Sequence, residues 1–443
     1  MERVFRRKIY EDLLKWKQEN KGKTALLVEG ARRVGKSTIV EEFAKNEYKS
    51  YILIDFNKAS KEIINLFDDL TNLDYIFLTL QSTFHVQLFT RESVIVFDEV
   101  QQCPRARQAI KYLVKDGRYD YIETGSLISI KQNTQNITIP SEEDRLSMYP
   151  MDYEEFRWAM GDTASFPLLK VYYNQHIPLG PALRTSMRDF RLYMLVGGMP
   201  QAVNTYLDTN NLQKVDETKR KIIRLYEDDF LKIDSTGKVG KLFMSIPGQL
   251  ARSASRFVPY YALGSVEEDK LLEMLNALED SKTVNMVYHC DDPNVGMSLT
   301  QDVSRYKIFM ADTGLFVTLA FWDKSYAENI LYEKLLSDKL EVNLGYVYEN
   351  IVAQMLVAAG NKLFYYTFPK DEKHNYEIDF LLSRGNKILP IEVKSSSYRS
   401  HASLDAFCQK YSHRITQPTL LCTKDYSHDG MTQIMPVILS IFL

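Results

Sequence analysis

Short apolar runs alternate with stretches of helical spacing through the first 150 residues of the chain. The runs occupy residues 24–29, 51–56, 93–99, 121–126 and 145–150. Continuous apolar runs of this length are typical of strands buried on both faces, and helices between them are typical of parallel sheets. The pattern therefore predicts an α/β fold over residues 1–150, with helices on both faces of a parallel sheet.

The spacing of apolar residues changes after residue 150. Long helical patterns predict a helical region over residues 151–236. Residues 237–325 are expected to form helices followed by two strands, and residues 326–443 begin a second α/β pattern. The chain therefore contains four predicted segments.

Composition limits the class of protein. A length of 443 residues exceeds the usual size of a domain with a single hydrophobic core, so about two to four domains are expected. The net charge of −3 gives no overall signal for nucleic acid. No apolar run is long enough to span a membrane, and the N-terminus lacks the apolar core of a signal peptide. The four cysteines are scattered, which predicts neither a disulfide framework nor a zinc site, so we expect a cytoplasmic protein without a membrane partner.

Residues 30–37 read Gly-Ala-Arg-Arg-Val-Gly-Lys-Ser and fit the pattern of a phosphate-binding loop. Glycines are needed where backbone N–H groups must approach a phosphate closely. Lys36 is placed to reach the β- and γ-phosphates, and the Ser37 hydroxyl is placed to bind Mg²⁺. A strand before the loop and a helix after it supply the context that the pattern requires. The predicted nucleotide-binding residues are Gly30, Ala31, Arg32, Arg33, Val34, Gly35, Lys36, Ser37 and Thr38.

The apolar run at 93–99 ends in Asp98 and Glu99. A carboxylate at the end of a buried strand lies near the phosphate loop, so Asp98 is expected to hold Mg²⁺ through its water shell. Glu99 is the predicted catalytic residue, which polarises the attacking water. The alternative is that both are ordinary acids at a strand end. Thr124 and Ser126 are candidates either to contact the γ-phosphate or to cap the next turn, and Arg145 is left without a role.

Several segments together resemble a widespread prokaryotic family. They are GARRVGKST (30–38), IVFDEVQ (95–101), ETGS (123–126), MYPMDYEEF (148–156), YMLVGGMPQAV (193–203) and FMADTGLF (309–316). The family consists of AAA-type, STAND-like ATPases with a C-terminal domain of unknown function. The resemblance implies an ATP-binding core, a helical region, a winged-helix unit and a restriction-endonuclease-like C-terminal domain, with ATP and Mg²⁺ as cofactors.

The winged-helix unit has an acidic candidate recognition helix. Residues 267–282 carry six acidic residues and two lysines, a net charge of −4. Leu271, Leu272, Leu275 and Leu278 form an apolar stripe at helical spacing. Because affinity for DNA rests on cationic contacts, a protein partner is favoured over DNA for this unit.

Residues 376–396 predict a hairpin whose charges match a metal-dependent nuclease. Asp379 and Glu392 are the candidate Mg²⁺ ligands, Lys394 is the candidate activator of water, and Glu349 resembles the helical glutamate of such sites. The alternative is a solvated face of a hairpin. Ile378 stands where many active nucleases have proline. The net charge of +4 over residues 384–414 suits DNA as a partner.

These observations predict an ATPase that works as a nucleotide-dependent switch and is coupled to a nuclease-like domain. The alternative is a non-enzymatic regulatory or scaffold protein, which holds ATP and binds protein or DNA. The sequence specifies no oligomeric state.

Overall fold

The computed structural model describes residues 3–126, 141–252, 255–337, 344–395 and 399–443. The chain forms two compact units. The first runs to Pro150 and takes in Asp280–Lys282, and the second comprises Met151–Glu279 and Thr283–Leu443. No helix within the described residues is long and apolar enough to cross a membrane.

The first unit is built on a parallel sheet with the strand order β2-β3-β4-β1-β5. The strands are β1 (Ala25–Glu29), β2 (Ser50–Asp55), β3 (Ser93–Asp98), β4 (Asp120–Gly125) and β5 (Glu143–Ser147). Each overlaps a predicted apolar run, and the largest difference at an end is three residues, at the end of β5. The predicted α/β class and parallel sheet are therefore confirmed.

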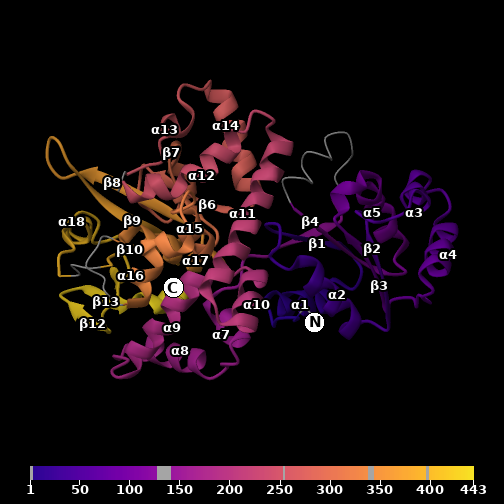
Figure 1. Ribbon diagram of the computed structural model, residues 1–443, viewed down its shortest axis with the longest axis horizontal. Helices are drawn as coiled ribbons and strands as arrows, with labels where there is room; N and C mark the ends of the chain where they lie inside the picture. The colour runs from indigo at the N-terminus through magenta and orange to yellow at the C-terminus, as the bar shows by residue number, and fades with distance from the viewer. Residues whose placement is uncertain (1–2, 127–140, 253–254, 338–343, 396–398) are drawn as a thin grey trace. The chain divides into compact units, whose positions relative to one another are not determined.

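Helices cover this sheet (Figure 1). They are α1 (Ile9–Asn20), α2 (Lys36–Glu47), α3 (Lys61–Asn65), α4 (Leu73–Phe84) and α5 (Pro104–Asp116), with short 3-10 turns η1 (Leu66–Asp68) and η2 (Val100–Gln102). Helix α2 packs against β2, β3 and β4, while α3, α4 and α5 share one apolar core with side chains of β1 to β4. Parallel strands end at one edge of the sheet, so the segments that follow β1, β3 and β4 lie together there.

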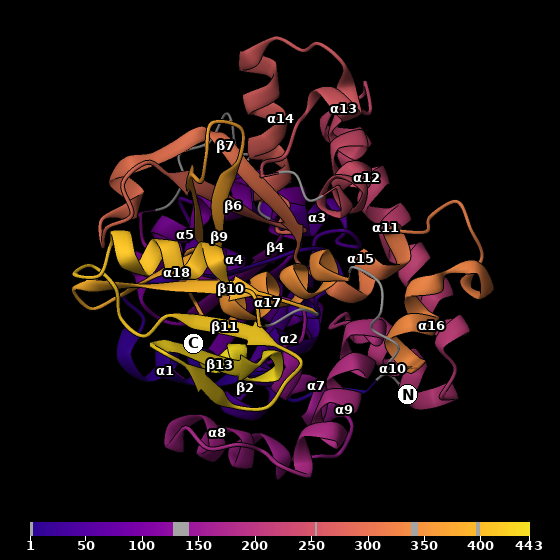
Figure 2. The ribbon, with the colours of Figure 1, turned by 90° about the vertical axis from the view of Figure 1, so that its left-hand side faces the viewer.

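The second unit contains a mixed sheet with the order β12-β13-β11-β10-β9-β8-β6-β7, part of which faces the viewer in Figure 2. Its strands are β6 (Val284–Cys290), β7 (Gln301–Met310), β8 (Phe364–Pro369), β9 (Asn375–Arg384), β10 (Lys387–Val393), β11 (Thr419–Cys422), β12 (Ser427–Asp429) and β13 (Thr432–Pro436). The β6–β7 hairpin corresponds to the two strands expected within residues 237–325, but β6 also pairs in parallel with β8. The sheet therefore crosses the predicted boundary between residues 325 and 326.

Helices make up most of residues 151–280. They are α7 (Tyr153–Ala159), α8 (Ser165–Gln175), α9 (Ala182–Val196), α10 (Pro200–Thr209), α11 (Leu212–Ile233), α12 (Lys238–Ala251), α13 (Tyr260–Leu263) and α14 (Glu268–Asp280). The later helices and 3-10 turns are η3 (Met297–Thr300), α15 (Thr313–Leu319), η4 (Tyr326–Glu328), α16 (Ile330–Ser337), α17 (Gly345–Ala358), α18 (Ala402–Lys410) and η5 (Val437–Phe442). Helix α17 packs against β6, β7 and β10, and α18 packs against β9 and β10. The helical middle region is thus confirmed.

Two of the segments that carry the family resemblance meet where α9 ends and α15 begins. The Asp312 carboxylate accepts hydrogen bonds from the N–H of Gly198 at 2.5 Å and from the N–H of Leu315 at 2.8 Å. A Cβ atom added to Gly314 would lie 2.5 Å from the Cα atom of Gly197. Both glycines are therefore required by the close approach of two backbones.

Candidate functional site

The phosphate loop joins β1 to α2, as its sequence predicts. Gly30 is required because a Cβ atom there would overlap the carbonyl oxygen of Met148. Gly35 has φ 98°, a left-handed conformation that favours glycine, and α2 begins directly after it. Arg33 also has a positive φ, of 71°. The loop therefore has the tight backbone that a phosphate cradle needs, at the N-terminus of a helix.

Lys36 is folded back onto its own loop. Its Nζ donates hydrogen bonds to the carbonyl oxygens of Gly30 at 3.0 Å and Ala31 at 2.9 Å, and the side chain is buried. Burial lowers the pKa of Lys36 to about 8, and the negative charges of Glu99 and Asp98 oppose this shift. The ammonium group thus occupies the loop with partners that a phosphate can replace.

Ser37 and Asp98 lie together, although 61 positions separate them. The Ser37 hydroxyl donates to Oδ1 of Asp98 at 2.6 Å, and the Thr124 hydroxyl donates to the same oxygen. Three elements, α2, β3 and β4, contribute one oxygen-bearing side chain each. A hydroxyl and a carboxylate are hard oxygen ligands of the kind that Mg²⁺ prefers, so these residues fit the predicted metal.

Glu99 follows β3 in a left-handed conformation, with φ 55° and ψ 47°. Its N–H donates to the hydroxyl of Thr124 at 3.3 Å, and its carboxylate accepts a hydrogen bond from the side chain of Gln101. A positive φ is unusual outside glycine and is often found at functional sites. The contacts of Thr124 fix both the Asp98 carboxylate and the Glu99 backbone, which is a positioning role that neither sequence-based alternative included.

Arg145 lies on β5, where its Nε pairs with Oε1 of Glu143 at 3.0 Å.

Arg7 is a residue of this unit that no sequence pattern indicated. Its guanidinium donates to the carbonyl oxygens of Val34 at 2.8 Å and Tyr149 at 2.6 Å, and the side chain is buried. Arg7 therefore ties the phosphate loop to the segment after β5. No local pattern marks it, because Tyr149 is 142 positions away.

The four predicted nuclease-like residues are brought together in the second unit. The ammonium of Lys394 pairs with Oε1 of Glu392 at 2.8 Å, and Oδ2 of Asp379 accepts from the N–H of Val393 at 2.8 Å. Burial and the charge of Glu349 raise the pKa of Asp379 well above its usual value. Burial also raises the pKa of Glu349, while Lys307 opposes that shift.

Two further charged residues join this group. Lys307, on β7, forms a close ion pair with Glu377 on β9, and its Nζ is 3.9 Å from Oε2 of Glu349 on α17. Glu377 lies two positions before Asp379 and could have been included from its sequence position. Lys307 comes from a segment 70 positions earlier, and nothing in its local sequence indicates the contact.

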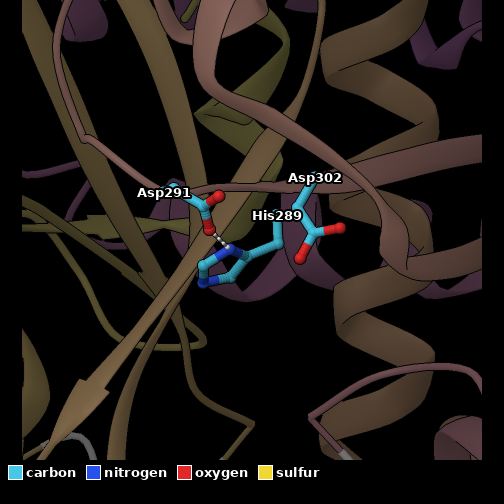
Figure 3. A group of neighbouring side chains, drawn as sticks. All are labelled: His289, Asp291 and Asp302. Atoms are coloured by element: carbon cyan, nitrogen blue, oxygen red, sulfur yellow. Dashed lines mark ion pairs between the residues drawn. The ribbon is translucent and has the colours of Figure 1, made fainter.

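A separate group of possible metal ligands consists of His289, Asp291 and Asp302 (Figure 3). Nε2 of His289 accepts a hydrogen bond from the backbone N–H of Thr367, so the ring proton of the neutral imidazole lies on Nδ1, 3.2 Å from Oδ1 of Asp291. Burial and the charge of Arg305 lower the pKa of His289. Neither nitrogen has a free lone pair in this arrangement, so the group is better explained as a hydrogen-bonded histidine.

Three segments match known domain families. Residues 22–157 match the AAA domain, residues 187–326 match a domain of unknown function (DUF8612), and residues 344–439 match another domain of unknown function (DUF4143). No curated protein matches the chain.

The solved structures found to be similar to the chain include two that are described as ATPases. The Walker-type ATPase PABY2304 of Pyrococcus abyssi is 18% identical, with 71% of this chain and 96% of that chain covered and a TM-score of 0.44. PCH-2 of C. elegans is 12% identical. The match covers 46% of this chain and 60% of that chain, with a TM-score of 0.25. The STAND protein PH0952 of Pyrococcus horikoshii is 9% identical. The match covers 76% of this chain and 46% of that chain, with a TM-score of 0.24.

The family match at residues 22–157 agrees with the parallel sheet, the phosphate loop and the acidic end of β3 described above. Residues 22–157 are therefore a P-loop ATPase domain of AAA type, and residues 344–439 belong to the domain family of unknown function.

Proposed function

We propose that the protein hydrolyses ATP and works as a nucleotide-dependent switch. The observation that carries this proposal is the contact of Ser37 and Thr124 with one oxygen of Asp98. Three elements far apart in sequence converge there, beside the phosphate loop. The match of residues 22–157 to the AAA domain supports ATP as the ligand.

The phosphate loop is proposed to bind the nucleotide through its backbone N–H groups and the side chains of Lys36 and Ser37. The backbone N–H groups of residues 30–37 surround the phosphates, and Lys36 exchanges the carbonyl oxygens of Gly30 and Ala31 for phosphate oxygens. Ser37 and Asp98 are the residues that would hold Mg²⁺ beside the nucleotide. When bound, Mg²⁺ neutralises charge that develops on the phosphates.

Glu99 is the proposed general base. Its left-handed backbone and the hydrogen bond from Gln101 fix where the carboxylate lies, next to the residues that hold the nucleotide. From there it accepts a proton from the attacking water. Thr124 positions Glu99 through its backbone and thereby joins the base to Asp98.

We propose different partners for two parts of the second unit. The cationic segment 384–414 is proposed to contact DNA, because Lys387, Arg399 and Lys410 are exposed. Helix α14 is proposed to contact a protein. Leu275 and Leu278 of the predicted stripe are buried, Leu271 is half-buried, and Leu272 remains 51% exposed beside Glu268, Asp269 and Glu273. The winged-helix and nuclease-like assignments stay predictions.

The alternative function is a scaffold that holds ATP without turnover. It shares the binding residues with the first proposal, and Glu99 separates the two, because only hydrolysis needs a base. The exposed side chain of Leu272 on α14 is compatible with either function.

Phosphate release and ATP affinity should therefore be measured for the parent and for Glu99→Gln. The amide keeps the size of the side chain but cannot accept the proton, so we expect hydrolysis to fall by about 10²–10⁴ while ATP affinity is retained. Glu92→Gln, at an exposed acid just before β3, is the matched control and should leave both quantities unchanged. No release by the parent, with DNA present or absent, would favour the scaffold.

A further inference from the structure

The carboxylate cluster of the second unit contains its own cation. The cluster consists of Glu349, Glu377, Asp379 and Glu392. Lys307 reaches it from β7, with a side chain that is only 5% exposed. An isolated buried ammonium is costly, so its burial requires compensating partners. The carboxylates of Glu377 and Glu349 are those partners.

Electrostatics keeps Lys307 charged in this position. Burial alone lowers the pKa of a lysine, but the negative charges of Glu377, Glu349 and Asp379 together raise that of Lys307 above its usual value. Two contacts place the ammonium of Lys307 among these carboxylates. It forms a close ion pair with Glu377, and its Nζ lies 3.9 Å from Oε2 of Glu349. The cluster is therefore organised around an ammonium group.

The remaining surroundings of Lys307 also suit an ammonium. Its Nζ lies 5.5 Å from the ring centroid of Tyr365, a buried side chain, within the range of a cation–π contact. Mg²⁺ requires about six oxygen ligands in octahedral geometry, and an aromatic ring supplies none. One oxygen of Asp379 is already bonded to the N–H of Val393. The residues present do not fit a divalent metal while Lys307 is in place.

We infer that Lys307 is the resident cation of this carboxylate cluster. Its ammonium group compensates the negative charges that a divalent metal compensates in nucleases with the same residue pattern. The second unit then holds no Mg²⁺ or Mn²⁺ at Asp379 and Glu392 and does not cut nucleic acid through them. Exposed cationic residues of segment 384–414 remain available to bind nucleic acid. This inference is independent of ATP hydrolysis by the first unit.

Metal binding by the full chain provides the first test. Free Mn²⁺ is measured by electron paramagnetic resonance, without nucleotide, for the parent and for Asp379→Asn. The amide keeps an acceptor for the Val393 N–H but weakens a metal site, and the ATP site is the same in both proteins. We expect equal Mn²⁺ binding. Binding by the parent that is lost in Asp379→Asn would overturn the inference.

Thermal unfolding provides the second test. Lys307→Met removes the ammonium and leaves buried carboxylates without compensation, so the melting temperature should fall by at least about 5 °C. Lys394→Met is the matched control, because Lys394 pairs with Glu392 while 36% exposed, and its effect should be smaller. Equal melting temperatures for the two variants would overturn the role of Lys307. If Lys307→Met does not fold, the Mn²⁺ comparison decides the question alone.

Discussion

Lys36 illustrates how a single residue links binding to pH. Its pKa in the free protein is about 8, and phosphate oxygens favour the charged form, so the pKa rises when ATP binds. Below pH 8 the free and bound states are both protonated, and affinity does not change. Above pH 8 binding must take up a proton, so we expect affinity to fall by roughly tenfold between pH 8 and 9.5. Calorimetry across this range measures it.

The matched control for this prediction is Lys36→Arg. An arginine stays charged at every pH used, so its affinity, although lower, should be constant. A flat profile for the parent would show that Lys36 keeps an ordinary pKa in the free protein. In addition, Lys36→Ala should lower ATP affinity at least about tenfold at pH 7, since a charge-assisted contact is lost.

Single residues were predictable where the chemistry is local. The phosphate loop is continuous in sequence, and Asp98 and Glu99 end a recognisable apolar run. Arg7 and Lys307 were missed because each acts on partners at least 27 positions away, and an isolated arginine or lysine is usually a solvated residue. Buried cations become visible only when the fold brings their acceptors together.

At the scale of elements, the contact between the end of α9 and the start of α15 depends on Gly314. Gly314→Ala places a Cβ atom 2.5 Å from the Cα atom of Gly197, so two backbones must separate. We expect the free energy of unfolding to fall by about 1–3 kcal/mol. Denaturant unfolding measures this change.

The control for this variant is Gly248→Ala, inside α12. A Cβ atom there meets nothing within 4 Å, and alanine is a better helix former than glycine. This variant should be neutral or slightly stabilising. If both variants unfold alike, the close approach of the two glycines contributes nothing to stability.

Helix α14 allows the proposed partners to be separated by salt. Lys270 pairs with Glu267 at 2.6 Å on an acidic helix, so Lys270→Ala should leave the salt dependence of duplex binding unchanged. Lys387→Ala, in the cationic segment, should reduce the slope by about one unit. Fluorescence anisotropy over a series of salt concentrations compares the two. A shallower slope for Lys270→Ala would assign DNA contacts to α14.

Elements were predicted more reliably than their pairing. The five strands of the first sheet and the helices of residues 151–236 follow local apolar patterns, which the structure reproduces. The pairing of β6 with β8 was not predicted, because it joins Tyr288 to Phe364, 76 positions later. Hydrophobic periodicity specifies which face of a strand is buried but not which strand lies beside it.

At the scale of the whole molecule, the proposed switch requires that the nucleotide state of the first unit change the affinity of the second unit for a partner. A switch needs a partner whose affinity differs between nucleotide states. Linkage makes this effect reciprocal: if ATP changes the affinity for DNA by some factor, DNA changes the affinity for ATP by the same factor. The proposal of a switch is therefore stricter than the proposal of an ATPase, since two independent measurements must agree.

This reciprocity gives a prediction for the full chain. Glu99→Gln should hold ATP without turnover, which allows equilibrium measurements. We expect ATP to change duplex affinity by at least about fivefold, and duplex DNA to change ATP affinity by the same factor. Anisotropy of labelled DNA and calorimetry with ATP provide the two values. Lys36→Ala, in which ATP binding is weakened, should show no change in duplex affinity at the same ATP concentration. If DNA and ATP bind Glu99→Gln independently, DNA is not the partner that the nucleotide state controls, and a protein bound at α14 takes that place in the switch.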